Sequence, residues 1–162
     1  MKIDITKLNN LFFIGVAGTG MSALAQYFAG LGKQVSGSDR YFSGGAPHDI
    51  QEKLETAGIC CYKQDGTGIT KEIELVVVSA AIEDTVIEVQ KAKEMGIPIM
   101  KRSELLACVV RSRKTIAIGG TSGKSSTSAM LFDILSYAGL QPGIISGAGL
   151  VSLIREGKIG NA

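Results

Sequence analysis

The stretch LFFIGVAGTGMSALAQYFAGLG, residues 11–32, decides the fold of this chain. It opens with a short continuous apolar run, residues 11–16, which is typical of a strand. A glycine-rich turn follows, and beyond it apolar residues recur at helical spacing from Met21 to Leu31. Gly32 stands where a left-handed residue commonly ends a helix. The stretch therefore predicts a strand, a tight turn and a helix, in that order.

The same alternation continues along the chain. We expect further strands at residues 34–39, 59–63, 75–80 and 97–101, and further helices at residues 49–58, 84–95 and 103–110, the last of them capped by Ser103. The unbroken β-branched run LVVVSA at residues 75–80 is typical of a strand that is covered on both faces. Strands that alternate with helices require parallel pairing and right-handed crossovers. The fold class is therefore α/β, with a doubly wound, Rossmann-like parallel sheet.

A second unit is expected to begin near residues 111–114. There the pattern restarts with a strand at residues 114–120, a glycine loop, a helix at residues 124–138 and a strand at residues 143–147. We therefore divide the chain into a complete Rossmann-like domain at residues 1–112 and the incomplete start of a P-loop ATPase domain at residues 113–162. On this interpretation the sequence is a fragment of a longer protein.

Composition excludes several classes of protein. The 162 residues are 45% hydrophobic and 20% charged, which is typical of a globular chain, and the net charge of +2 is too small to favour nucleic acid as a partner. No apolar run is long enough for a membrane span or a secretion signal, so we expect a cytoplasmic protein. The three cysteines form no CxxC pair and His48 is the one histidine, so we expect neither a Cys/His metal site nor a thiol nucleophile. The oligomeric state stays open.

The first glycine loop, GVAGTGMSA at residues 15–23, favours an anionic ligand. Glycines let the backbone turn tightly after a strand, and the following helix directs free N–H groups and its positive dipole end at a phosphate. Ala17 breaks the dinucleotide fingerprint GxGxxG, so the loop does not identify NAD as the ligand. Asp39 ends the next predicted strand and is placed to accept hydrogen bonds from a ribose. A nucleotide of some kind is predicted, and a purely structural turn is the alternative.

The second glycine loop, GGTSGKSST at residues 119–127, favours a nucleoside triphosphate. A Walker loop, GxxxxGK[ST], would have glycine in place of Ile118, so the match fails at its first position. The remainder still provides N–H groups for phosphates, a point charge at Lys124 and a hydroxyl at Ser125 for Mg²⁺. A chance run of Gly, Ser and Lys before a helix is the alternative.

Five motifs together resemble one known family. The segment GTSGKSS resembles the GT(x)GK[ST][ST] phosphate loop of the Mur ligases, and GVAGTGMSALA, SGSD, VVVSAAI and KRSELL are similar, in order and spacing, to the N-terminal half of the alanine-adding members. The resemblance implies an ATP-dependent ligase of peptidoglycan synthesis. Such an enzyme phosphorylates the lactyl carboxylate of UDP-N-acetylmuramate, after which the amine of an amino acid attacks the acyl phosphate.

The resemblance also implies roles for individual residues. The residues that would contact the UDP moiety are Gly18, Thr19, Gly20, Met21, Ser22, Asp39, Ser79, Ala80 and Ala81. Those that would contact the ATP phosphates are Gly120, Thr121, Ser122, Gly123, Lys124, Ser125 and Ser126. Lys124 would be catalytic and Ser125 would hold Mg²⁺.

The chain departs from the alanine-adding pattern at three positions of the phosphate loop. Ser122 stands where histidine is usual, and Ser125 and Ser126 stand where threonines are usual. The hydroxyls are retained, but the first change leaves the added amino acid open. Two alternatives therefore stand beside L-alanine addition: a family member that recycles murein tripeptide, and a non-catalytic module that binds a dinucleotide. The family's acidic metal-binding segment and C-terminal domain are not in this sequence, so the chain alone is expected to be inactive.

Overall fold

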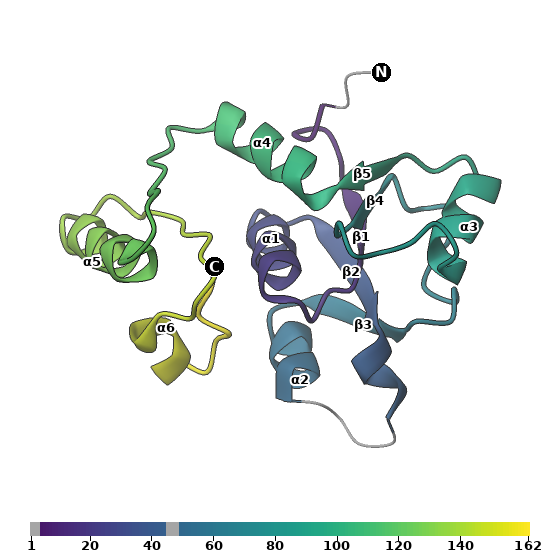
Figure 1. Cartoon of the computed structure of the whole chain (residues 1–162), viewed down its shortest axis with the longest axis horizontal. Helices are drawn as coiled ribbons and strands as arrows, with labels where there is room; N and C mark the ends of the chain where they lie inside the picture. The colour runs from purple at the N-terminus through teal and green to yellow at the C-terminus, as the bar shows by residue number, and fades with distance from the viewer. Residues whose placement is uncertain (1–3, 45–48) are drawn as a thin grey trace.

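The computed structural model describes residues 4–44 and 49–162, and its main feature is a parallel sheet (Figure 1). The sheet has five strands in the order β3-β2-β1-β4-β5. They are β1 (Asn10–Ile14), β2 (Gln34–Asp39), β3 (Ile59–Lys63), β4 (Leu75–Val78) and β5 (Ile99–Lys101). Every neighbouring pair is parallel, and β1 pairs with both β2 and β4. The predicted doubly wound, Rossmann-like sheet is confirmed.

Helices connect the strands and end where glycines allow the chain to turn. They are α1 (Thr19–Gly30), the short 3-10 helix η1 (Arg40–Ser43), α2 (Asp49–Thr56), α3 (Ile87–Glu94), α4 (Arg102–Ser112), α5 (Lys124–Tyr137) and α6 (Val151–Arg155). Gly32 adopts φ of 77° just after α1, and its N–H donates to the carbonyl of Ala29 at 2.9 Å. This left-handed position confirms the predicted end of the first helix. None of the helices in the described ranges is long and apolar enough to cross a bilayer.

The sheet is covered on both faces. One hydrophobic cluster joins Leu11 and Phe13 of β1 to residues of α1, α2 and α4, such as Leu24 and Leu105. The other joins Phe12 and Ile14 to α3 and to the loop before β4. In β4, Leu75 and Val77 belong to the first cluster and Val76 and Val78 to the second, so the prediction of a strand buried on both faces is confirmed.

The predicted cap of α4 is wrong. Ser103 lies inside the first turn of the helix and is exposed, because the helix begins one residue earlier, at Arg102. Glu104 closes this end instead: its carboxylate accepts a hydrogen bond from the N–H of Lys101 at 3.0 Å. A Glu at this position commonly reaches back to the residue that precedes a helix.

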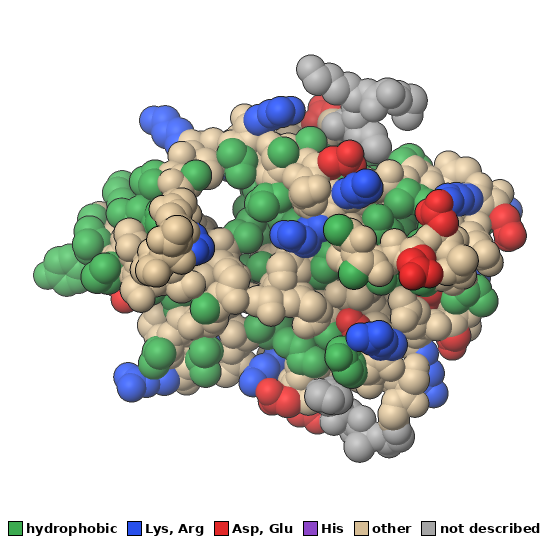
Figure 2. Space-filling model, viewed as in Figure 1, with side chains coloured by type: hydrophobic (Ala, Val, Ile, Leu, Met, Phe, Trp, Pro, Cys, Tyr) green, Lys and Arg blue, Asp and Glu red, His purple; other side chains and the backbone are tan. Residues whose placement is uncertain are grey.

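Residues 113–162 contain helices but no strand. The strands predicted at residues 114–120 and 143–147 do not form, whereas the predicted helix between them is present as α5. A strand requires a neighbour for its backbone hydrogen bonds, and neither segment has one in the described part of the chain. No residue of α5 is buried, and Figure 2 shows hydrophobic side chains gathered over this helix. Its exposed apolar residues include Met130, Ile134 and Tyr137.

Candidate nucleotide-binding site

The loops that follow β1 and β4 meet at the carboxyl edge of the sheet. The strand order reverses between these two strands, because β2 and β3 lie on one side of β1, and β4 and β5 lie on the other. A Cβ built on Gly15 would lie 3.8 Å from Cδ1 of Ile82, so the two loops are in contact. In open α/β sheets, ligands bind at the carboxyl edge where the order reverses. The first glycine loop therefore lies where such a fold places a ligand.

Backbone hydrogen bonds hold the first glycine loop against the end of β2. The N–H groups of Gly15 and Val16 donate to the carbonyl of Ser38 at 2.7 and 3.1 Å. The N–H of Ala17 donates to Oδ2 of Asp39 at 3.0 Å, and Oδ1 of the same carboxylate accepts from the N–H of Tyr41 at 3.1 Å. Asp39 is only 5% exposed. Its carboxylate orders the loop, while its predicted contact with a ribose stays a prediction.

The start of α1 presents backbone rather than side chains to a ligand. The N–H groups of Met21 and Ser22 both donate to the carbonyl of Gly18, and both side chains are buried. The N–H groups of Thr19 and Gly20 have no acceptor within the described ranges. Of the residues predicted to surround a diphosphate, residues 18–20 are therefore the accessible ones. Direct contacts from the side chains of Met21 and Ser22 are not supported by this geometry.

The loop after β4 lies beside the first glycine loop. Ser79 is half-buried, and Ala80 and Ala81 are exposed. The carbonyl of Ser79 accepts a hydrogen bond from the N–H of Ile82 at 3.2 Å, so this loop turns tightly back. The predicted contribution of these residues to a nucleotide site is compatible with their position at the carboxyl edge.

The second glycine loop is exposed and precedes α5. Gly123 has φ of 77° and is the residue before the helix, and Gly120 has φ of 149°. The ammonium group of Lys124 donates to the carbonyls of Gly120 and Thr121 at 2.6 and 3.2 Å, so the lysine folds over its own loop. Positive φ values at glycines let successive N–H groups point to one side, which suits an anion. The loop geometry therefore fits phosphate groups.

The metal prediction depends on a single hydroxyl. Ser125 and Ser126 are exposed, and the described ranges contain no cluster of His, Cys, Asp or Glu that could hold a metal ion. A Mg²⁺ ion at Ser125 would thus take its remaining ligands from phosphate oxygens and water.

Elsewhere, burial raises the pKa of the Cys61 thiol to about 12, so this cysteine is not a nucleophile near neutral pH. His48 lies outside the described residues.

A buried asparagine connects residues 143–162 to the start of α1, a contact that no sequence motif predicted. Nδ2 of Asn161 donates to the carbonyl of Thr19 at 2.8 Å and to Oγ of Ser22 at 3.0 Å. Its Oδ1 accepts from Nε2 of Gln26 at 2.8 Å. Asn161 is 1% exposed, and its own carbonyl accepts from the N–H of Ser146. The segment after α5 is therefore fastened to the helix that begins at the first glycine loop.

Removing this asparagine should weaken the attachment. We expect Asn161→Ala to lower the free energy of unfolding by about 1–3 kcal/mol, because buried partners lose their hydrogen bonds. A double-mutant cycle with Gln26→Ala gives the coupling free energy between Asn161 and Gln26, when the free energy of unfolding of each variant is measured by urea denaturation. Coupling of about 0.5 kcal/mol or more is expected for residues in contact. Additive effects of the two substitutions would show that the contact contributes nothing to stability.

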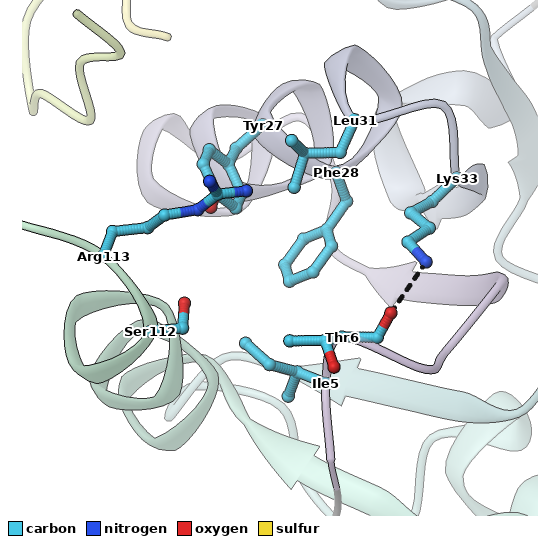
Figure 3. Close-up of a pocket in the computed structure, with 8 residues that line it drawn as sticks. All are labelled: Ile5, Thr6, Tyr27, Phe28, Leu31, Lys33, Ser112 and Arg113. Carbon is cyan, nitrogen blue, oxygen red and sulfur yellow. Dashed lines mark hydrogen bonds between the residues drawn. The ribbon is translucent and has the colours of Figure 1, made fainter.

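The cavity shown in Figure 3 lies away from both glycine loops. It has a volume of about 230 Å³ and is lined by Ile5, Thr6, Tyr27, Phe28, Leu31, Lys33, Ser112 and Arg113. Lys33 directly precedes β2 and donates to the carbonyl of Thr6, so the cavity is at the amino edge of the sheet. Nucleotides in this type of fold bind at the opposite, carboxyl edge. We therefore assign no nucleotide to this cavity.

Comparisons with known proteins agree with the fold. The model of the Mur ligase family, catalytic domain, matches residues 10–114. The UDP-N-acetylmuramate–L-alanine ligase of Desulfatibacillum aliphaticivorans is 36% identical over 155 residues, which is 96% of this chain and 33% of that protein. The chain thus spans about a third of the length of the curated relatives it matches.

Two solved structures are similar over most of the chain. The crystal structure of the UDP-N-acetylmuramate-alanine ligase MurC of Thermotoga maritima has a TM-score of 0.78 and 26% identity, and covers 94% of this chain and 34% of its own. The UDP-N-acetylmuramate:L-alanyl-γ-D-glutamyl-meso-diaminopimelate ligase of Neisseria meningitides has a TM-score of 0.72 and 27% identity, and covers 86% of this chain and 43% of its own.

Proposed function

The chain belongs to the Mur ligase family, and from this premise we propose that it is the N-terminal part of an ATP-dependent ligase that joins L-alanine to UDP-N-acetylmuramate. The observation that supports this best is the pair of glycine loops, each at the start of a helix, within a chain that aligns with alanine-adding relatives over 96% of its length. One loop suits a diphosphate and the other a triphosphate.

The first loop and the carboxyl edge would bind the UDP moiety. The free N–H groups of Thr19 and Gly20 would donate to a diphosphate at the positive end of α1. The loop at residues 79–81 would line the same edge, and Asp39 would hold the glycine loop in place from behind. We propose residues 1–112 as the UDP-binding domain.

The second loop would bind ATP, and residues 113–162 would begin the domain that contains it. The loop's N–H groups would hold the phosphates, and Ser125 would contribute a hydroxyl to Mg²⁺. Lys124 would turn from the carbonyls of its own loop to the transferred phosphoryl group and stabilise the charge that develops there.

The reaction follows from the two ligands together. ATP would supply the γ-phosphoryl group that converts the lactyl carboxylate to an acyl phosphate, with ADP as the leaving group. The amine of the amino acid would then attack the acyl carbon, form the amide bond and release inorganic phosphate. The residues of this chain would contribute by aligning the reactants and by stabilising charge. These two effects together supply much of the catalysis in phosphoryl transfer.

Ligand titration tests the first half of this proposal. We expect the chain to bind UDP-N-acetylmuramate in isothermal titration calorimetry, and to show no heat with NADH at the same concentration. The physical reason is that Ala17 replaces a fingerprint glycine of dinucleotide sites, while the helix N–H groups that suit a diphosphate are retained. Selective binding of NADH would overturn the UDP assignment and support a dinucleotide-binding module instead.

Addition of murein tripeptide is the second candidate within the family. The similarity to the tripeptide-adding enzyme of Neisseria meningitides supports it, although its TM-score is lower than that of the alanine-adding enzyme. Ser122, where histidine is usual in alanine-adding members, leaves this candidate open. An assay of the complete ligase with L-alanine and with the tripeptide as competing acceptors distinguishes the two.

A further inference from the structure

We infer that Asn161 is a positioning residue for the first glycine loop, and that binding of the UDP-sugar at this loop tightens the attachment of residues 143–162 to α1. This inference rests on the proposed function of that loop. Asn161 is distant from the loop in sequence, yet its side chain donates to the first turn of α1. Figure 1 shows the end of the chain beside this helix.

The main contact of Asn161 falls on a single peptide group at the start of α1. Its Nδ2 donates to the carbonyl of Thr19 at 2.8 Å. That carbonyl and the N–H of Gly20 belong to the same peptide unit, which is planar. The N–H of Gly20 has no acceptor in the described ranges and is one of the two that would donate to the diphosphate. Asn161 therefore fixes the orientation of a donor that it does not itself touch.

The second partner of Asn161 strengthens this arrangement. Oγ of Ser22 donates to the carbonyl of Thr19 at 3.0 Å and accepts from Nδ2 of Asn161 at 3.0 Å. Ser22 and Asn161 are each 1% exposed, so water does not compete for these bonds. Hydrogen bonds in a chain polarise one another. A bond from the N–H of Gly20 to a phosphate oxygen would thus be reinforced by the two bonds that the carbonyl of the same peptide accepts.

The segment that contains Asn161 is closed on itself and packed on the sheet domain. The N–H of Ser146 donates to the carbonyl of Asn161 at 3.0 Å, so the two ends of the segment are joined. Ile145 and Ile159 pack against the hydrophobic cluster that includes Leu24 of α1. Coupling between two binding equilibria is reciprocal. If the attached segment favours binding of the UDP-sugar, the UDP-sugar must favour the attached segment by the same factor.

Calorimetry tests the first half of this inference. We expect Asn161→Ala to weaken binding of UDP-N-acetylmuramate to the chain by about 3- to 10-fold, the range that corresponds to loss of one hydrogen bond between neutral groups. Val89→Ala is the matched control, because it removes buried apolar atoms from α3, in the cluster on the opposite face of the sheet from α1. It should lower stability but bind the ligand as the unmodified chain does.

Hydrogen exchange followed by NMR tests the reciprocal half. Saturating UDP-N-acetylmuramate should slow exchange of the Ser146 N–H in the unmodified chain by a similar factor, because the segment opens less often. In Asn161→Ala this slowing should be lost. The substitution removes only a side chain, so the Ser146 N–H keeps its backbone acceptor and remains a valid probe.

The outcomes separate this inference from the proposed function. If the unmodified chain binds UDP-N-acetylmuramate and Asn161→Ala binds it equally well, only the inference is overturned. Equal weakening by Asn161→Ala and Val89→Ala would also overturn it, and so would a slowing of exchange that persists in Asn161→Ala, because either result reflects general stability. Failure of the unmodified chain to bind the ligand would overturn the proposed function as well.

The unmodified chain alone decides should Asn161→Ala not fold. The inference requires the ligand to slow exchange of the Ser146 N–H more than exchange of the Gln90 N–H, which donates to the carbonyl of Val86 at the start of α3. Equal slowing at both positions would overturn it, because a ligand that only stabilises the whole fold protects both.

Discussion

Lys124→Ala should reduce ATP-dependent product formation by the complete ligase by at least about 100-fold, while the affinity for UDP-N-acetylmuramate stays within about 2-fold of its original value. Removal of one group that stabilises transition-state charge commonly costs this much in rate. Lys124 is exposed at the start of α5, and its ammonium group already lies over the loop that would hold the phosphates. The proposed UDP-sugar site is on a different loop, so the affinity for the UDP-sugar should be unaffected.

The fold should survive this substitution. The carbonyls of Gly120 and Thr121 lose a donor, but both residues are exposed and water can replace it. Circular dichroism should therefore match that of the original protein. Lys114→Ala is the control, because Lys114 is exposed and outside the glycine loop, and it should leave turnover unchanged. Undiminished turnover of Lys124→Ala would remove this lysine from the mechanism.

Periodicity and glycines predicted the sheet domain well, because each signal has a local cause. The strands at residues 34–39 and 59–63 form over their predicted lengths as β2 and β3. Gly58 and Gly96 have φ of 81° and 68°, as expected of residues that end a helix. The ends of β1, β4 and β5 and of α2, α3 and α5 were predicted too long, and α4 was predicted too short. The end of a strand depends on where its neighbours stop pairing with it, and a local sequence pattern does not contain this information.

Residues 113–162 could not be predicted equally well, because strands depend on distant partners. The run TIAI at residues 115–118 is apolar enough for a strand, yet Ile116 is 65% exposed. In contrast, α5 forms without burying any residue, because the hydrogen bonds of a helix are internal to it. Local patterns are hence sufficient for this helix and insufficient for the strands beside it.

For the candidate site, motifs located the loops but not the contacts. The contact of Asp39 with a ribose stays a prediction, and the motifs did not indicate that its carboxylate accepts from two backbone N–H groups of the protein. Ser22 was expected to contact the ligand, and its hydroxyl instead donates to the carbonyl of Thr19. Asn161 was missed because its partners are distant in sequence.

Gly37→Ala should lower the free energy of unfolding by about 3 kcal/mol and the melting temperature by roughly 6–12 °C. A Cβ at this position would lie 2.6 Å from the carbonyl oxygen of Phe13 and 2.7 Å from Cβ of Val16. Phe13 is the partner of Gly37 in the β1–β2 register, and Val16 belongs to the glycine loop that folds back on β2. Neither atom is the end of a flexible side chain, so strand and loop would have to separate.

Separation of the first glycine loop from β2 should also weaken binding of UDP-N-acetylmuramate at that loop. The N–H of Val16 donates to Ser38, next to Gly37, so a displaced loop would also shift the start of α1. Gly30→Ala is the matched control, because a Cβ there meets nothing within 4 Å, and alanine in a helix is favoured over glycine by up to about 1 kcal/mol. Thermal denaturation of both variants, followed by titration with UDP-N-acetylmuramate, measures the two effects. A Gly37→Ala protein as stable as the original would show that the loop and β2 are not as closely packed as these distances require.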